Sequence, residues 1–238
     1  MSKLISVVIP AYNEAKRIKK TLNYISEYLL KNKYRYEIVV VDDGSRDDTA
    51  RVVENIGLPG VRLEKYNANR GKGFAVNYGV TKSKGDYILF CDADNATPFY
   101  EIKKMLEQIE EYPVVIGSRY LKDSKIKFYQ PLFRRIASRF GNMLIQIMIL
   151  PGISDTQCGF KMFQADAAKE IFSRQTIWRW GFDMEVLYIA KKLNYKIKQV
   201  PVDWYSQEGS KIQSSNVFLT TFSELVKIKT RGILGHYR

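Results

Sequence analysis

The sequence predicts an α/β fold, with a mostly parallel central sheet flanked by helices on both faces. The first half of the chain carries the main observation, because short β-branched apolar runs alternate there with segments of helical periodicity. Clusters of acidic and turn-forming residues follow several of these runs. Since parallel strands bind ligands beyond their carboxyl ends, the clusters predict one functional site at that edge of the sheet.

The elements of the first half follow from their residue patterns. Strands are expected where β-branched apolar runs end in turn residues, at 4–9, 36–41, 61–65, 87–91 and 114–116. Helices are expected where apolar residues recur at helical spacing or capping residues occur, at 14–31, 47–56, 72–83 and 98–111. Because strands and helices alternate along the chain, neighbouring strands should be parallel.

The second half is less regular. Residues 120–131 resemble a basic loop, and 132–150 predict a long apolar helix with one narrow polar stripe. A helix is also expected from Val186 to Leu193, and 216–231 predict a basic amphipathic helix. The polar stripe consists of Arg135, Ser138, Arg139, Asn142 and Gln146. The apolar side of 216–231 carries Phe218, Phe222, Leu225 and Val226, and its polar side Lys227, Thr230 and Arg231.

Composition and charge limit the classes of function. A chain of 238 residues with 45% hydrophobic and 13% aromatic residues predicts one folded globular domain with an ample core. A formal charge of +13 attracts nucleic acid, anionic lipid headgroups or phosphorylated ligands, without choosing among them. The single histidine, His236, argues against a histidine metal site or a Ser-His-Asp triad.

The cellular location is predicted from cysteine usage and hydropathy. Cys91 and Cys158 are too few for a disulfide framework, which indicates a reducing, cytosolic location. The N-terminus runs directly into the first expected strand without the pattern of a signal peptide. No apolar run reaches the ~20 residues that a membrane-spanning helix needs.

Asp92 and Asp94 are the most informative side chains, because they follow the apolar run 87–91 where a strand ends. Two carboxylates at this spacing can hold a hard divalent cation, and such a cation can clamp a diphosphate. Taken alone, Asp-x-Asp is more often a solvated loop. Other acids at strand ends and a glycine-rich loop upstream favour the metal interpretation here.

A polar segment directly follows the first expected strand and contains Pro10, Tyr12, Asn13 and Glu14. A tyrosine ring can stack on a nucleotide base, and Asn and Glu can form hydrogen bonds with a ribose or base edge. The alternative is an ordinary strand-to-helix turn in which Asn13 is the N-cap.

Two further loops can also bind a nucleotide or serve as ordinary turns. Asp42 and Asp43 follow the second expected strand and can either bind a base or ribose or form the turn into the next helix. The loop 69–73, with Arg70 and Lys72, can form a phosphate cradle at a helix N-terminus, although its spacing is not that of a Walker loop.

The second half contains charged residues in glycine- or aromatic-rich segments. These segments are Gly117–Arg119, Asp155–Lys161, Trp180–Glu185 and Glu208–Lys211. Core packing is the alternative for Trp178, Trp180 and Phe182. Asp183 and Glu185 stand at the start of an expected helix, where they could face a pocket.

Taken in order, these segments resemble the inverting family 2 glycosyltransferases with the GT-A fold. The matching segments are Val7–Glu14, Val41–Ser45, Asn69–Gly73, Asp92–Asp94 and Gly117–Arg119. In the second half, Asp155–Lys161, Arg179–Asp183 and Glu208–Lys211 are similar to the dolichyl-phosphate β-glucosyltransferase branch. The resemblance covers residues 4–215, nearly the whole chain.

The resemblance implies a role for each matching residue. Asp92 and Asp94 would bind Mg²⁺ or Mn²⁺, and with Asp183 and Arg119 they would form the catalytic set. The nucleotide sugar would be bound by Pro10, Tyr12, Asn13, Glu14, Asp42, Asp43, Arg70, Lys72 and Asp92. Acceptor or phosphate contacts would come from Arg119, Arg134 or Arg135, Gln157 and Lys211. The single domain would divide into a nucleotide-sugar half (1–118), an acceptor half (119–215) and a basic amphipathic tail (216–238).

The implied reaction is transfer of glucose from UDP-glucose to a dolichyl or polyprenyl phosphate, with inversion. Ala96 stands where related mannose synthases carry a glutamine metal ligand, which disfavours GDP-mannose as the alternative donor. Glucosyl relatives from eukaryotes carry an N-terminal membrane anchor, and this sequence does not begin with one, so we expect peripheral attachment to the cytoplasmic face of a membrane.

Three other interpretations stay open from the sequence. One is a transferase of the same fold with a soluble or polysaccharide acceptor. The second is a nucleotide-sugar-binding regulator without catalysis. The third is a nucleic-acid-binding protein, against which stand the mixing of basic and acidic residues and the absence of a nucleic-acid-binding motif. The sequence does not predict the oligomeric state of the protein.

Overall fold

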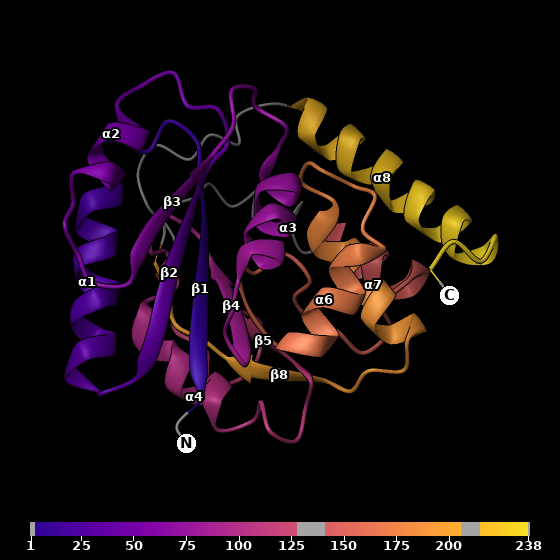
Figure 1. Cartoon of the computed structure of the whole chain (residues 1–238). Coiled ribbons are helices and arrows are strands. Elements are labelled where there is room, and N and C mark those ends of the chain that lie inside the picture. The colour runs from indigo at the N-terminus through magenta and orange to yellow at the C-terminus, as the bar shows by residue number, and fades with distance from the viewer. Residues whose placement is uncertain (1–2, 128–140, 206–214, 238) are drawn as a thin grey trace.

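A seven-stranded sheet forms the centre of the computed structural model, with strand order β3-β2-β1-β4-β7-β5-β8 (Figure 1). The structure describes residues 3–127, 141–205 and 215–237. The strands of the sheet are β1 (Leu4–Ala11), β2 (Arg35–Asp42), β3 (Val61–Lys65), β4 (Tyr87–Cys91), β5 (Val114–Ser118), β7 (Phe160–Gln164) and β8 (Ile197–Pro201).

The predicted α/β class with a mostly parallel sheet is confirmed. β1 pairs in parallel with β2 and β4, β2 with β3, and β5 with β8. The sequence does not predict β7, which lies antiparallel between β4 and β5. Its direction has a physical reason: the chain leaves β5 at the carboxyl edge, and Asp155, just before β7, is still bound to Arg119 at that edge. The next strand must therefore begin there and run back.

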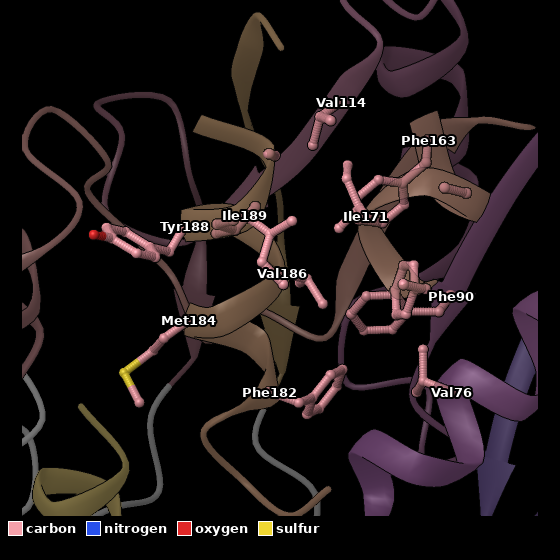
Figure 2. Close-up of a cluster of buried hydrophobic side chains, with 14 of the residues drawn as sticks. Val76, Phe90, Val114, Phe163, Ile171, Phe182, Met184, Val186, Tyr188 and Ile189 are labelled. Atoms are coloured by element: carbon pink, nitrogen blue, oxygen red, sulfur yellow. The ribbon is translucent and has the colours of Figure 1, made fainter. Parts of the chain in front are cut away.

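Helices cover both faces of the sheet (Figure 1). They are α1 (Ile18–Lys31), α2 (Thr49–Glu54), α3 (Lys72–Lys82), α4 (Ile102–Leu106), α6 (Ala165–Ser173), α7 (Phe182–Lys192) and α8 (Ser215–Ile233). α1, α2 and α4 contribute buried side chains to the core on one face. α3, α6, α7 and α8 contribute to the core on the other, where Phe90 and Phe163 of the sheet meet Phe182 and Ile171 of the helices (Figure 2).

The first helix begins later than its periodicity predicts. The sequence predicts a helix over 14–31, whereas α1 begins at Ile18. Asn13 has a left-handed backbone with φ 53°, and its N–H donates to the Ser45 hydroxyl at 2.9 Å. The N–H of Glu14 donates to the Thr49 hydroxyl at 2.7 Å. These N–H groups bind the loop after β2 and the first residue of α2, and the N-cap of α1 is Arg17, so the interpretation of Asn13 as that N-cap is wrong.

Other boundaries differ in the second half. The predicted helix 98–111 is a 3₁₀ turn (Phe99–Glu101) followed by the short α4. The predicted loop 120–131 contains β6 (Ile126–Lys127), which pairs in parallel with β9 (Trp204–Tyr205). Of the predicted helix 132–150, residues 141–148 are helical, and 132–140 lie outside the described residues. The helix predicted from Val186 already begins at Phe182.

α3 packs on the sheet through a position that accepts no side chain. A Cβ on Gly79 would lie 2.4 Å from Cγ1 of Val8 in β1. We expect Gly79→Val to lower the free energy of unfolding by about 1–3 kcal/mol, because the helix must move off the strand. Urea denaturation measures this loss. Thr81→Ala, on the exposed side of the same helix, should change stability by no more than about 0.5 kcal/mol. Equal effects of the two variants would contradict this packing.

Candidate active site

A pocket of about 380 Å³ opens at the carboxyl edge of the sheet, where β1, β2 and β4 end. β1 lies between β2 and β4, so the connections leave it in opposite directions, which is where doubly wound sheets bind ligands. Predicted residues that line the pocket are Pro10, Tyr12, Glu14, Asp43, Lys72, Asp92 and Asp94. The others are Ala11, Arg17, Asn69, Gly71, Ala93, Arg179 and Trp180.

Asp43 shapes one wall of this pocket by binding the loop that leads into α3. Its carboxylate accepts hydrogen bonds from the backbone N–H groups of Arg70 (2.7 Å) and Gly71 (3.0 Å). The Tyr66 hydroxyl and the Asn69 amide donate to it at 2.8 and 2.9 Å. Burial, together with the bond to Asp43, raises the pKa of Tyr66, so its phenol stays a donor.

The structure corrects the prediction that the loop 69–73 cradles a phosphate. The amides of Arg70 and Gly71 point at the internal carboxylate of Asp43, which satisfies them. The guanidinium of Arg70 lies 3.6 Å from the centroid of the Phe74 ring, and Arg70 is not among the residues lining the pocket. Loop 69–73 therefore forms a wall of the pocket, and among its basic side chains Lys72 is the one that lines it.

Asn13 and Asp42 also lie beside the pocket without lining it. The Asn13 side-chain oxygen accepts a hydrogen bond from the backbone N–H of Arg46 at 2.8 Å. Asp42 is buried and accepts one from the N–H of Ser45 at 3.1 Å. Both side chains hold the turn after β2, which supports the turn interpretation for Asp42 and places the Asn13 side chain in that same turn rather than on the pocket wall.

Charged groups alternate across the floor of the pocket. The Lys72 ammonium lies 2.6 Å from Oδ1 of Asp92. Burial lowers the pKa of Lys72, but Asp92, Asp183 and Asp94 outweigh burial and raise it above its ordinary value, so Lys72 stays charged. Burial, followed by repulsion from Asp92, raises the pKa of Asp94. A bound cation would relieve that repulsion.

Gly159 sets the position of Asp92. A Cβ at Gly159 would lie 2.1 Å from Oδ2 of Asp92 and 2.6 Å from its Cγ. Gly159 directly precedes β7, and β7 pairs with β4, the strand that leads into Asp92. β7, which the sequence does not predict, therefore places Gly159 against the carboxylate of Asp92.

Asp183 and Glu185 have different surroundings, and neither lines the pocket. Asp183 is buried and forms an ion pair with the buried Lys161. Glu185 is fully buried, and its carboxylate accepts hydrogen bonds from the N–H groups of Thr176 (2.9 Å) and Ile177 (2.7 Å). The expectation that Glu185 faces a pocket is wrong, because it binds the backbone of the preceding loop.

Arg119 is held rigidly at the end of β5. Its Nε and one terminal nitrogen donate to the two oxygens of Asp155 at 2.7 and 2.9 Å. Burial would raise the pKa of Asp155, but the Arg119 guanidinium lowers it below its usual range. The guanidinium also lies 5.6 Å from the ring centroids of Tyr120 and Trp204. It faces a second pocket of about 510 Å³, which is lined by Arg119, Tyr120, Leu121, Ser124, Ile126, Asn142, Gln146 and Ser154.

Of the other residues predicted to contact the acceptor, Gln157 is the one that lies within the described part of the chain. Gln157 is exposed, and its backbone N–H donates to Asp155 at 3.3 Å. Arg134, Arg135 and Lys211 lie outside the described residues, as does the rest of the segment 208–211. Asn142 and Gln146 of the predicted polar stripe line the second pocket.

Sequence reasoning missed Arg17, Arg179 and Trp180 as pocket residues. Arg17 forms an ion pair with Glu14, three positions earlier, and this spacing was the available signal. Arg179 and Trp180 belong to a segment that the sequence singled out, but core packing was the alternative preferred for Trp180. Trp180 is 36% exposed and lines the pocket, whereas Phe182 is fully buried.

Two features are absent from the described part of the chain. Across residues 3–127, 141–205 and 215–237, no group of three or more His, Cys, Asp or Glu side chains is placed to hold a metal ion. None of the helices described is long and apolar enough to cross a membrane.

The sheet and the acidic pocket at its carboxyl edge define a GT-A-type glycosyltransferase. The chain belongs to glycosyl transferase family 2, whose model matches residues 6–172. It is 38% identical to dolichyl-phosphate beta-glucosyltransferase of Dictyostelium discoideum, over 98% of this chain and 76% of that protein. The Homo sapiens protein of that name is 36% identical, over 100% of this chain and 78% of that protein.

Solved structures share the fold. Glucosyl-3-phosphoglycerate synthase from Mycobacterium tuberculosis, in complex with Mn²⁺, UDP and phosphoglyceric acid, matches with TM-score 0.74 and 18% identity over 95% of this chain and 78% of that one. Mannosyl-3-phosphoglycerate synthase from Rubrobacter xylanophilus matches with TM-score 0.69 and 16% identity, over 97% and 74% of the two chains. At this identity the likeness concerns the fold alone.

Gly159→Ala tests the placement of Asp92. The added methyl group must displace the carboxylate, so we expect glycosyl transfer to fall about 10²-fold or more, as when a positioned group moves by about 1 Å. Steady-state kinetics and thermal unfolding should be measured together. Gly57→Ala is the control, because its methyl group meets nothing within 4 Å while its φ of +66° imposes backbone strain. It should lower stability and leave transfer unchanged; wild-type transfer by Gly159→Ala would contradict the proposed placement.

Proposed function

We propose that this chain transfers glucose from UDP-glucose to the phosphate of dolichyl phosphate or a related isoprenyl phosphate, with inversion at the anomeric carbon. One observation carries the proposal: relatives named dolichyl-phosphate beta-glucosyltransferase align with 98–100% of the chain at 36–38% identity. The pocket at the carboxyl edge of β1, β2 and β4 supplies the groups that such a donor requires.

The donor occupies this pocket in the proposal. Tyr12 offers a ring on which the uracil base can stack, with Pro10 beside it. Glu14 offers hydrogen-bond acceptors for the ribose hydroxyls and is oriented by its ion pair with Arg17. Lys72 and Arg179 supply positive charge for the diphosphate.

A divalent cation fits the acidic part of the pocket. Asp92 and Asp94 both line it, and their mutual repulsion contributes to the raised pKa of Asp94. Mg²⁺ is commonly held by one or two carboxylates, together with waters and substrate phosphates, so two carboxylates are a sufficient protein contribution. When bound, Mg²⁺ or Mn²⁺ would neutralise charge on the departing diphosphate. The residues that would hold it are Asp92 and Asp94.

The acceptor phosphate is assigned to Arg119 and the pocket beside it. The Asp155 pair fixes the plane of the guanidinium, uses Nε and one terminal nitrogen, and leaves the other terminal nitrogen outside the pair, while Arg119 lines the second pocket. Arg134, Arg135 and Lys211, predicted to join this contact, stay predictions. Asp183, beneath the floor of the donor pocket, contributes to the charge that keeps Lys72 protonated.

The chemistry requires little proton transfer from the protein. A phosphate monoester has a second pKa near ~6, so the acceptor oxygen is largely ionised at neutral pH. The side chains therefore act mainly by aligning the two substrates and by stabilising the charge of the leaving diphosphate. That is consistent with a pocket containing lysine, arginine and carboxylates.

The outer face of α8 is the proposed contact with the lipid surface that carries the acceptor. Phe222, Val226 and Ile233 are exposed there, at 45, 43 and 72%, and Leu234, directly after the helix, is 68% exposed. Exposed Lys227 and Lys229 stand among them, which suits anionic headgroups. The sequence assigns Leu225 to the same apolar face, but Leu225 is buried in the core, and Arg231 is half-buried rather than on the polar outer side.

Purified protein should be mixed with Mn²⁺ or Mg²⁺, a short isoprenyl phosphate and either UDP-glucose or GDP-mannose. We expect nucleoside diphosphate release and a glucosyl-lipid of the calculated mass from UDP-glucose, and no product after chelation of the metal. Asp94→Asn should lower turnover by about 10²-fold or more, because it removes a charge from the proposed cation site.

The matched control for this substitution is Asp48→Asn, which changes an exposed aspartate outside the pocket and should keep wild-type activity. Wild-type turnover by Asp94→Asn would exclude the proposed cation site. Metal-dependent release of UDP without a lipid product would exclude the acceptor.

The double variant Phe222→Ser/Ile233→Ser tests the membrane contact. It removes two exposed apolar side chains, so binding to vesicles with anionic lipid should weaken about tenfold or more in a sedimentation assay. Leu30→Ser, which removes an equally exposed side chain from α1, should bind vesicles like the wild type. Turnover of a short, water-soluble acceptor should be unchanged in both variants, and unaltered vesicle binding by the double variant would contradict the role of α8.

A further inference from the structure

The loop 174–181 delivers two residues to the donor pocket. It connects α6 to α7 and carries Arg179 and Trp180, both of which line the pocket. Its backbone also contacts the start of α3, because the N–H of Phe74 donates to the carbonyl oxygen of Trp178 at 3.2 Å. Whatever fixes this loop therefore fixes one side of the donor pocket.

We propose that α8 and Tyr237 form a brace that positions the loop 174–181, so that Tyr237 is a positioning residue for the donor. The inference rests on the proposed function for its kinetic test, but its geometry does not. It assigns a role in donor binding to the C-terminal end of the described chain, whose outer face is the proposed membrane contact.

Glu185 is the centre of the brace. One carboxylate oxygen accepts the N–H groups of Thr176 and Ile177. The other accepts the Tyr237 hydroxyl at 2.7 Å and the hydroxyl of Thr176. Glu185 is fully buried and Tyr237 is 1% exposed, so neither can touch a ligand in this pocket. A buried carboxylate requires this full set of donors, and one of them comes from the C-terminal segment.

α8 itself binds the loop at two further points. The Glu224 carboxylate accepts the N–H of Gly181 at 2.8 Å, directly after Trp180. The guanidinium of Arg231 donates to the hydroxyl of Thr176 at the other end of the loop. The helix therefore holds both ends of the segment that presents Arg179 and Trp180.

Close packing keeps the brace against α7. A Cβ on Gly232 would lie 2.2 Å from the Tyr188 hydroxyl, so only glycine permits this approach. The rings of Tyr188 and Tyr237 meet edge to face, with centroids 5.9 Å apart. Leu225 and Ile228 of α8 are buried in the core on the inner side of that helix. Figure 1 shows α8 lying outside α6 and α7, with its first turn near the carboxyl edge of the sheet.

The brace explains why so polar a cluster is buried far from the reacting groups. Its carboxylate, two hydroxyls and guanidinium join the loop 174–181 and α7, which are consecutive, to the C-terminal segment, which is distant in the chain. An apolar contact would hold these elements together, but hydrogen bonds to backbone N–H groups additionally fix the path of the loop.

Tyr237→Phe is the test, since it removes one hydroxyl and keeps the ring. We expect the Kd for UDP-glucose, measured by calorimetry, and the KM for UDP-glucose each to rise about three- to tenfold, because part of the effect of losing one hydrogen bond reaches the donor pocket through the loop. The KM for the isoprenyl phosphate should not change. Hydrogen–deuterium exchange should increase at the amides of 174–181. This measurement tests the brace independently of the proposed function.

Tyr87→Phe is the matched control, because the Tyr87 hydroxyl also donates to a glutamate, Glu110, and Tyr87 begins β4 at the edge of the sheet opposite the pocket. It should leave donor binding and exchange at 174–181 unchanged. In a Trp180→Ala background, Tyr237→Phe should cost little further affinity, because both act through the same contact.

Unchanged exchange at 174–181 in Tyr237→Phe would overturn the brace. So would an equal loss of donor affinity with and without Trp180, since a general loss of stability would produce that pattern. A wild-type protein that binds no UDP-glucose would refute the proposed function, while the exchange comparison would still decide whether the brace exists.

Discussion

The donor pocket depends on the hydrogen bonds between the Asp43 carboxylate and the loop that leads into α3. These bonds fix the amides of Arg70 and Gly71, and thereby the first turn of α3. Lys72 is the first residue of that helix and reaches Asp92 at the end of β4. The ends of β2 and β4 are therefore connected across the pocket by one loop, and without Asp43 the loop amides would have to find another acceptor.

Other buried charges of the protein are compensated in pairs. Asp155 is matched by Arg119 and Asp183 by Lys161. Buried ion pairs need such specific geometry, because desolvation otherwise exceeds the attraction. Asp94 differs, since burial and a neighbouring carboxylate raise its pKa more than the nearby cations lower it. A cation bound beside it would offset that repulsion.

α8 uses two apolar faces for different purposes. Leu225 and Ile228 pack into the core, while Phe222 and Val226 are exposed on the other side. A periodic pattern records that a helix has apolar stripes, but it does not say which stripe meets the protein and which meets a lipid surface. The same helix holds the loop 174–181, so the proposed lipid contact and the proposed donor site meet in one element.

The sequence by itself determined the α/β class, the family, and the acids at the ends of β1, β2 and β4, because parallel strands bring consecutive strand ends to one edge. It could place Glu14, Asp92 and Asp94 together for that reason. Only the tertiary structure decided which polar groups remain available to a ligand. The amides of Arg70 and Gly71 bind Asp43, and Glu185 binds Tyr237, so partners distant in the chain satisfy them. Such pairings depend on how elements pack, and local residue patterns carry no record of it.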